Sequence, residues 1–373
     1  MLEFIDEELK LLKGTGLYRQ LRTIEKTDGR TITIDGKSYL NFCSNNYLGL
    51  ANHPRIIEAA QKATAEYGAG AGASRLISGN TILHEKLERK IAEFKKREAA
   101  IVFPTGFMAN LGVMTALLDE KDTVIIDRLD HASIIDACRL SKAKLQVYPH
   151  KDMKALEKIL GRSQSFSKRL IVTDSVFSMD GDLAPLPEIW SLANKHRSLV
   201  MIDEAHATGV LGKCGRGLEE HFGLEGRTDI VMGTLSKAIG SLGGFVAGSQ
   251  QLINYLHNKA RSFIYTTALP PASCAAALAA LELIENDPSF LNKLRANLKS
   301  FSAIVPIIPI ILGSAEKAVK ASQDLFKRGI LLSAIRPPTV PQDQSRLRLT
   351  ICAQHTKEDI DCLASLLQEL IPA

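Results

Sequence analysis

Seven short, almost wholly apolar runs recur along the middle of the chain, and they constrain its fold more than any other feature. Helix-length segments separate most of these runs. Short apolar strands that alternate with helices are typical of a mainly parallel sheet covered by helices on both faces, because each strand is then buried on both sides. The runs are AAIVF (99–103), TVIID (123–127), KLQVY (144–148), RLIVTD (169–174), LVMID (199–203), DIVMGT (229–234) and GGFVAG (243–248).

The segments on either side of this region have a different pattern. TITIDGKSYLNF, residues 31–42, indicates a β-hairpin with an Asp-Gly turn. Two long helical patterns follow Pro271, then strands near Leu331 and at 346–351, and a closing helix. IVPIIPIIL, residues 304–312, is too short to span a bilayer, and its two prolines favour an irregular edge strand.

A chain of 373 residues is too long for one small core, so we expect a large domain and a smaller one. We predict an N-terminal arm over residues 1–40, a large domain over 41–270 and a small α+β domain over 271–373. The arm is expected to pack with the small domain. Helical patterns at 53–67 and 81–97 belong to the large domain.

Polar residues follow several of the apolar runs, at the edge of the sheet where ligands bind in open α/β folds. Asp203 ends LVMID and His206 follows it in DEAHATG, while Thr234 and Lys237 follow DIVMG. Lys237 stands out because it lies in a tight, glycine-rich stretch, where a long charged side chain needs a use. We therefore expect these side chains to share one site.

Three further runs bring residues to the same edge. Ser178 follows RLIVTD, and His131 follows TVIID with a ring that could stack on a planar cofactor. AAIVF leads through Pro104 and Thr105 into a helix, so the backbone N–H groups of Gly106 and Phe107 lie at a helix N-terminus. Such a terminus binds phosphate.

A phosphate cradle, a lysine and a carboxylate at the end of a buried strand together suggest pyridoxal 5′-phosphate. Lys237 would bond covalently to the cofactor, and Asp203 would keep its ring nitrogen protonated. Taken singly, Asp203 could be a helix cap, His206 a core histidine and Lys237 a surface lysine. Because these ordinary explanations would have to hold independently at four strand ends, we favour the cofactor site.

Composition limits the partners and the redox environment. The formal charge of +5 is mild, and Lys and Arg are spread along the chain, so neither nucleic acid nor a membrane is an expected partner. The cysteines have no C-x-x-C pair and no metal-ligand spacing, so we expect reduced thiols, no metal site and a cytoplasmic location. They are Cys43, Cys138, Cys214, Cys274, Cys352 and Cys362.

Motifs of competing enzyme classes are missing. The sequence has no G-x-S-x-G elbow, no H-E-x-x-H helix and no Walker-type phosphate loop; GVLGKCG at 209–215 has the wrong spacing. A nicotinamide-binding fold is the main rival on pattern alone. It requires G-x-G-x-x-G directly after the first strand, and GAGAGASRLISG at 68–79 does not follow a strand.

From about Leu17 to its end, the chain resembles the α-oxoamine synthase family of fold-type I pyridoxal-phosphate enzymes. Within that family it is most similar to the branch that joins L-alanine to a pimeloyl thioester. The resemblance implies an aspartate-aminotransferase-like α/β fold and a homodimer with active sites at its interface. It rests on NFCSNNYLGL, GAGASRLISG, FPTGFMAN, DHASIIDA, FSMDGDLAPL, DEAHATGVLG, GTLSKA, IYTTALPP and AIRPPTVP.

The resemblance also implies roles for individual residues. Lys237, His131 and Asp203 are expected to be catalytic. The cofactor would further contact Gly106, Phe107, Ser178, His206 and Thr234, and a partner hydroxyl from Thr266 or Thr267 would reach the phosphate. The substrates would be held by Arg19, Asn45, His131, Arg336, Thr339 and Arg348, with Asn45 and Arg348 receiving the alanine carboxylate.

The implied reaction is a decarboxylative condensation in biotin synthesis, with the pimeloyl group carried by coenzyme A or by acyl carrier protein. Three alternatives stay open. A glycine C-acetyltransferase or another sibling synthase would share every cofactor residue, although AIRPPTVP and IYTTALPP count against it. An aminotransferase would share Lys237 and Asp203 but need no acyl site. A non-enzymatic regulator would normally need an added DNA-binding module.

Overall fold

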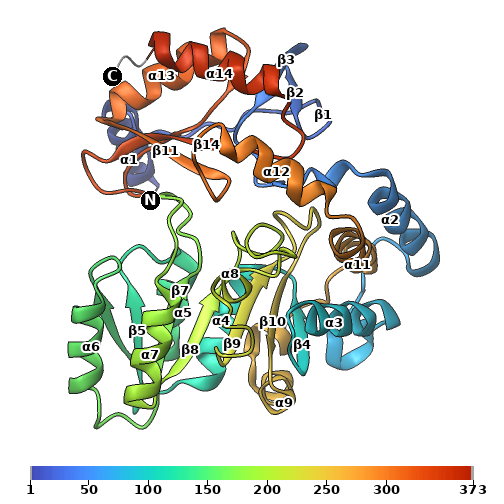
Figure 1. Ribbon diagram of the computed structural model, residues 1–373, viewed down its shortest axis with the longest axis vertical. Helices are drawn as coiled ribbons and strands as arrows, with labels where there is room; N and C mark the ends of the chain where they lie inside the picture. Colours follow the sequence, from blue (N-terminus) through green and yellow to red (C-terminus); the bar gives the residue numbers. More distant parts are fainter. Residues whose placement is uncertain (1, 371–373) are drawn as a thin grey trace. The chain divides into compact units, whose positions relative to one another are not determined.

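The computed structural model describes residues 2–370 and divides the chain into two compact units, which are described separately (Figure 1). The larger unit comprises Asn46–Ser178 and Asp182–Asn292. The smaller unit comprises the rest of the described chain, including the three residues Met179–Gly181.

A seven-stranded sheet forms the centre of the larger unit, in the order β4-β10-β9-β8-β7-β5-β6. All its strands are parallel except β10, which pairs antiparallel with both β4 and β9. The seven apolar runs form these seven strands, which confirms the predicted sheet. They are β4 (Ala99–Phe103), β5 (Thr123–Asp127), β6 (Lys144–Tyr148), β7 (Arg169–Asp174), β8 (Leu199–Asp203), β9 (Ile230–Thr234) and β10 (Gly244–Gly248).

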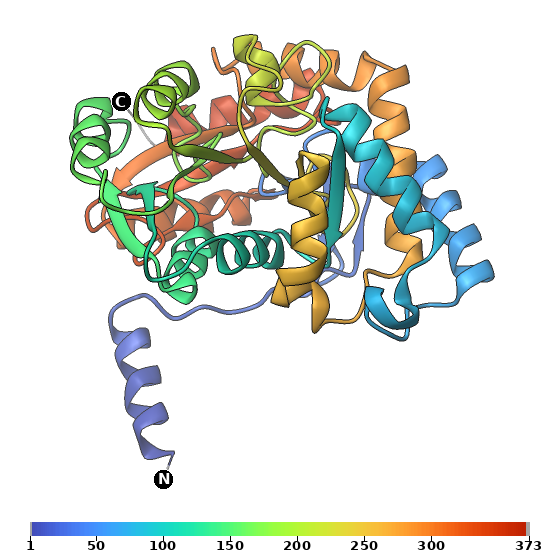
Figure 2. The same ribbon diagram turned by 90° about the horizontal axis from the view of Figure 1, so that it is seen from below.

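Helices cover both faces of this sheet, as Figures 1 and 2 show. One face packs on α4 (Gly106–Leu117), α5 (Ala132–Ser141), α9 (Gln250–Lys259) and α10 (Arg261–Ile264), whose apolar residues join those of the strands in one core. The remaining helices of the sheet region are α3 (Ile82–Phe94), α6 (Met153–Arg162), α7 (Leu186–His196) and α8 (Leu218–Phe222). Burial on both sides is the reason why the inner strands are largely apolar, whereas the edge strand β6 has exposed residues at Lys144 and Val147.

Helix α11 (Pro271–Asn286) packs on α2 (Pro54–Tyr67) and on α3, and Lys90 of α3 forms an ion pair with Glu285. These contacts place α11 in the larger unit, whereas the sequence-based division assigned everything after residue 270 to the small domain. The two divisions differ because a helical pattern does not reveal which neighbour its apolar face covers. Two short turns, η1 (Leu50–Asn52) and η2 (Arg75–Gly79), flank α2.

The smaller unit contains two small sheets. In the first, β2 (Thr31–Ile34) and β3 (Lys37–Asn41) form the expected hairpin, and Asp35 and Gly36 both have the positive φ that its tight turn requires. The order of that sheet is β1-β2-β3-β12, and that of the second is β11-β14-β13. The additional strands are β1 (Lys26–Thr27), β11 (Ile307–Gly313), β12 (Ile330–Leu331), β13 (Ala334–Ile335) and β14 (Ser345–Thr350).

Strand β11 lies at a sheet edge, as its prolines predicted. Pro309 pairs in register with Arg348 of the central strand β14. An edge position tolerates proline because the missing N–H can face away from the ladder. The helices of this part of the chain are α1 (Glu3–Gly14), α12 (Ser289–Lys299), α13 (Ala315–Lys327) and α14 (Lys357–Leu370).

Candidate active site

Parallel strands bring their last residues to one edge of the large sheet. Asp174 at the end of β7 pairs in register with Asp203 at the end of β8, and Asp203 pairs with Met232 of β9, two residues before Thr234. Residues at the ends of neighbouring parallel strands therefore lie side by side at this edge, as the site prediction from the sequence assumed.

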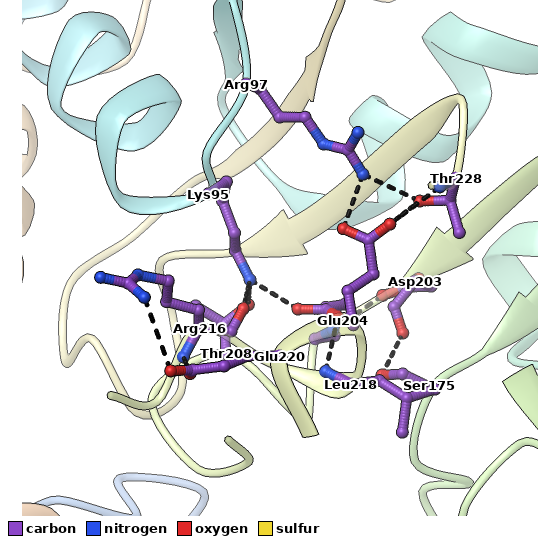
Figure 3. A network of polar contacts seen from close by, with 12 residues as sticks. Lys95, Arg97, Ser175, Asp203, Glu204, Thr208, Arg216, Leu218, Glu220 and Thr228 are labelled. Carbon is purple, nitrogen blue, oxygen red and sulfur yellow. Dashed lines mark hydrogen bonds and ion pairs between the residues drawn. The ribbon is translucent and has the colours of Figure 1, made fainter. Parts of the chain in front are cut away.

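Asp203 is a buried carboxylate, 3% exposed. Its Oδ1 accepts a hydrogen bond from the backbone N–H of Ala205, and its Oδ2 accepts one from Asn110 Nδ2, both at 2.9 Å. Its carbonyl oxygen accepts from the hydroxyl and backbone N–H of Ser175 (Figure 3). Each carboxylate oxygen can accept a further hydrogen bond, so Asp203 is fixed in place and can still receive a proton donor.

A chain of hydrogen bonds joins Asp203 to His131. Asn110 Nδ2 also donates to Ser133 Oγ at 2.9 Å, and Ser133 Oγ lies 2.8 Å from His131 Nδ1. Because His131 Nδ1 also accepts the backbone N–H of Ser133, at 3.2 Å, the neutral ring carries its proton on Nε2. The surrounding protein, by displacing water, and the charge of Lys237 lower the pKa of His131, which favours this neutral ring.

The backbone of His131 is held by a second aspartate. Its N–H donates to Asp174 Oδ2 at 3.0 Å, and Asp130 Oδ1 in turn accepts the N–H of Asp174 at 2.8 Å. Burial raises the pKa of both Asp130 and Asp174 well above the usual range, and repulsion from nearby carboxylates adds to it. These carboxyl groups therefore tie the loop after β5 to the end of β7.

Lys237 lies half-buried in the loop between β9 and β10, with its Nζ 2.9 Å from His206 Nε2. The other ring nitrogen of His206, Nδ1, lies 2.5 Å from the hydroxyl oxygen of Tyr47. His206 is 6% exposed and Tyr47 is completely buried. The lysine and the histidine that the sequence placed in one site are thus in direct contact.

Helix α4 begins at the same edge. Thr105 caps it by accepting the N–H of Met108, and no acceptor within the described residues takes the N–H groups of Gly106 and Phe107. A Cβ on Gly106 would lie 3.6 Å from Thr234 Cβ, so the helix terminus adjoins the end of β9. A Cβ on Gly244 would lie 2.6 Å from the backbone nitrogen of Gly106, so this approach requires glycine at 244.

Thr234 and Ser178 complete the predicted contacts of the larger unit. The hydroxyl of Thr234 donates to the carbonyl oxygen of Gly243 at 2.8 Å and accepts the N–H of Ser236. The hydroxyl of Ser236, an exposed residue, lies beside it and donates to the same carbonyl oxygen at 3.3 Å. Ser178 is half-buried at the end of the β7 loop.

A buried ion pair supports the loop that carries Asp203 and His206 (Figure 3). Lys95 Nζ lies 2.5 Å from Glu204 Oε2 and 2.8 Å from Thr208 Oγ1, and Glu204 Oε1 accepts the N–H of Leu218 at 2.7 Å. The side chains of Lys95 and Glu204 are 3% and 1% exposed. A buried pair with its remaining hydrogen bonds satisfied holds one geometry, and here it fixes residues 204–208.

The predicted substrate residues belong to the smaller unit. Arg348 on β14 is buried and donates to Asn45 Oδ1 at 3.2 Å and to Thr350 Oγ1 at 3.0 Å. Arg336 donates to the carbonyl oxygen of Gly16, and burial together with the neighbouring charge of Arg19 lowers its pKa. Two guanidinium groups close enough to repel one another form a place that favours an anion.

Thr339 lies exposed in the turn after Arg336, whose carbonyl oxygen accepts its N–H at 3.1 Å. The structure therefore brings Lys237 to His206, Arg348 to Asn45, and Thr339 to Arg336. Sequence reasoning missed Tyr47, Asn110 and Ser133. For Asn110 a signal existed, since it is a lone amide in the otherwise apolar helix GFMANLGVMTAL.

Comparisons with known proteins identify the family of this chain. The model of the family "Aminotransferase class I and II" matches residues 37–367. The 8-amino-7-oxononanoate synthase of Thermoanaerobacter pseudethanolicus is 48% identical over 96% of this chain and 94% of its own length. The 8-amino-7-oxononanoate synthase 1 of Bacillus subtilis is 45% identical over 96% of this chain and 95% of its own length.

Solved structures show the same fold. A serine palmitoyltransferase variant from S. paucimobilis, with bound PLP and myriocin, superposes with a TM-score of 0.93 at 31% identity, covering 99% of this chain and 97% of that one. The 8-amino-7-oxononanoate synthase of Francisella tularensis gives a TM-score of 0.78 at 30% identity, covering 89% and 97%. The chain belongs to the aminotransferase class I and II family and, within it, to the 8-amino-7-oxononanoate synthases.

Proposed function

We propose that this protein condenses L-alanine with a pimeloyl thioester, carried by coenzyme A or acyl carrier protein, to give 8-amino-7-oxononanoate for biotin synthesis. A bond forms between the alanine Cα and the acyl carbonyl carbon. The thioester C–S bond breaks and releases the thiol carrier, and the alanine carboxylate leaves as CO2. The observation that carries the proposal is the contact of Lys237 with His206 beside the buried Asp203, in a chain of this family.

Pyridoxal 5′-phosphate is the cofactor, and the residues present fit it. Asp203 is a buried carboxylate with acceptor capacity left, as a protonated ring nitrogen requires. The free N–H groups of Gly106 and Phe107 suit a phosphate at a helix N-terminus. Thr234 adjoins this helix terminus, and it would contribute a hydroxyl group to the site together with Ser178 and Ser236. His206 and Lys237 supply the remaining two contacts.

When bound, the cofactor acts as an electron sink for the carbon next to the alanine nitrogen. Lys237 would hold the cofactor covalently, and its free amine would take the proton from that carbon. Asp203 would stabilise the positive ring nitrogen, and the neutral His131 would pack on the ring and orient it. These charges develop during the reaction, so fixed groups such as Asp203 lower its barrier.

Residues of the smaller unit select the substrates. Arg348, held by Asn45 and Thr350, receives the alanine carboxylate, because a buried guanidinium pairs well with a carboxylate. Arg19 and Arg336 receive the distal carboxyl group, or its ester, at the far end of the pimeloyl chain, with Thr339 beside them. The repulsion that lowers the pKa of Arg336 would be relieved by such an anion.

The protein acts as a homodimer in the cytoplasm, with Thr266 or Thr267 reaching the partner's phosphate site. In the structure Thr267 is exposed and Thr266 is half-buried, so both hydroxyls are accessible on the single chain. The described cysteines are free thiols, which fits a reducing compartment. No helix within residues 2–370 combines the length and apolar character that crossing a bilayer requires.

The function is tested by incubating the purified, cofactor-loaded protein with pairs of substrates. Alanine and glycine are each combined with acetyl-, octanoyl- and pimeloyl-coenzyme A, and serine with palmitoyl-coenzyme A, and the release of CO2 and free thiol is measured. We expect alanine with pimeloyl-coenzyme A to give the highest kcat/KM and 8-amino-7-oxononanoate as product. If glycine with acetyl-coenzyme A reacted best, the protein would be a glycine C-acetyltransferase.

Variants of Arg336 and Arg348 should differ in the same assay, because Arg336 is proposed to bind the acyl donor and Arg348 the alanine. Arg336→Ala should lower kcat/KM for pimeloyl-coenzyme A about ten- to a hundredfold, the value of a lost charge-assisted contact, and leave octanoyl-coenzyme A nearly unaffected. Arg348→Ala should raise the Kd for alanine and leave the order of acyl preference unchanged. An equal loss with pimeloyl and octanoyl donors in Arg336→Ala would remove this arginine from the acyl site.

A further inference from the structure

Tyr47 is a buried phenol whose position no sequence motif explained. It follows β3 in the turn at Asn46, and its side chain is 0% exposed among the neighbouring buried residues Leu48 and Leu50. A buried hydroxyl requires a partner. That partner is His206, whose Nδ1 lies 2.5 Å from the tyrosine oxygen.

The contact made by the opposite ring nitrogen of His206, Nε2, determines whether Tyr47 accepts or donates the hydrogen bond with Nδ1. Lys237 Nζ lies 2.9 Å from Nε2, and a charged ammonium can only donate. Nε2 must then accept, so the neutral ring carries its proton on Nδ1 and donates it to the tyrosine oxygen. Without cofactor, His206 is therefore expected as the Nδ1–H form.

Cofactor binding would reverse the hydrogen-bonding roles of the two ring nitrogens of His206. In the proposed function the nitrogen of Lys237 would be engaged by the cofactor, and His206, as an expected cofactor contact, would face an acceptor such as the ionised oxygen of the cofactor's ring hydroxyl. Nε2 must now carry the proton, and Nδ1 must accept. A phenol can bond Nδ1 in either tautomer, because its oxygen accepts from Nδ1–H and its O–H donates to an unprotonated Nδ1.

We propose that Tyr47 is a positioning residue that keeps His206 hydrogen-bonded in both tautomers, so that Nε2 can accept from Lys237 in the empty protein and donate to the loaded cofactor. Only the part of this proposal that concerns the cofactor-loaded protein rests on the proposed function. Phenylalanine at position 47 would fill the same space and remove the hydrogen bond that Tyr47 makes with Nδ1. His206 would then lose its fixed orientation in both states.

The experiment compares Tyr47→Phe with Tyr148→Phe. Tyr148 is a matched control, since it is 1% exposed in the same unit and its hydroxyl contacts Thr173. Nitrogen-15 NMR of histidine-labelled wild-type protein reports the tautomer directly, and His206→Gln identifies the signal of His206. We expect Nδ1–H without cofactor and Nε2–H with it.

In Tyr47→Phe, the Kd for pyridoxal phosphate should rise about tenfold, the approximate cost of one unsatisfied buried group, with kcat reduced and KM for pimeloyl-coenzyme A unchanged. Tyr148→Phe should change neither. One tautomer in both wild-type states, or equal cofactor affinity in the two variants, would overturn the proposal. Neither the cofactor Kd nor the NMR signal involves the acyl substrate, so both remain informative if synthase activity itself is not found.

Discussion

Lys237→Ala should reduce turnover by at least about 10⁴-fold, because the same side chain both holds the cofactor and moves the alanine proton. Asp203 and the N–H groups of Gly106 and Phe107 are unchanged in this variant. The protein should therefore still bind pyridoxal phosphate, without the covalent bond that borohydride reduction traps in the wild type. Mass spectrometry after reduction and steady-state assays measure the two effects.

Lys213→Ala is a suitable control, since Lys213 is an exposed lysine of the same unit. It should retain wild-type turnover and the trapped cofactor at Lys237. Near-wild-type activity in Lys237→Ala would remove this lysine from the chemistry and with it the proposed mechanism.

Asp203→Asn should lower kcat by about 10²- to 10³-fold, the usual loss when a preorganised electrostatic group is removed. An asparagine keeps the shape of the side chain but leaves the ring nitrogen largely unprotonated, so the ring withdraws electrons poorly. Exchange of the alanine Cα hydrogen with D2O, followed by NMR without any acyl donor, should slow by a similar factor. Cofactor binding should persist.

Asp229→Asn provides the comparison, because Asp229 lies just before β9, at the other end of the sheet, where its Oδ2 accepts the N–H of Val200 at 2.8 Å. It should exchange the alanine hydrogen at the wild-type rate. Undiminished exchange in Asp203→Asn would mean that Asp203 only fixes the end of its strand.

The sequence predicted the large sheet almost residue by residue because local pattern and burial coincide there. The strands from β4 to β10 match the predicted runs, and the last residues of the parallel strands mark the edge where ligands bind. His131, Asp203, His206 and Lys237 could be named for that reason, since each lies at or just after a strand end. The roles of Lys237, Asp203 and His131 were inferred from these positions, and the family resemblance added that of His206. All of them stay predictions until variants are measured.

The contacts that fix these residues could not be predicted, because they join segments far apart in the chain. Tyr47 lies 159 positions from His206, and Asn110 lies 93 from Asp203. Hydropathy patterns report which side of an element is buried but not which polar atom faces another. The packing of α11 on α2 escaped prediction for the same reason.

The smaller unit is assembled from both ends of the chain, and this has a consequence for synthesis on the ribosome. Strand β3 pairs with β12, and Asn45 bonds Arg348 across a separation of 303 residues. The larger unit ends at Asn292, so its strands are all available while β12, the parallel partner of β3, is still unmade. Domains fold as their residues emerge, and contacts distant in sequence form late. The nascent chain should therefore form its cofactor site first and its proposed binding site for the alanine carboxylate last.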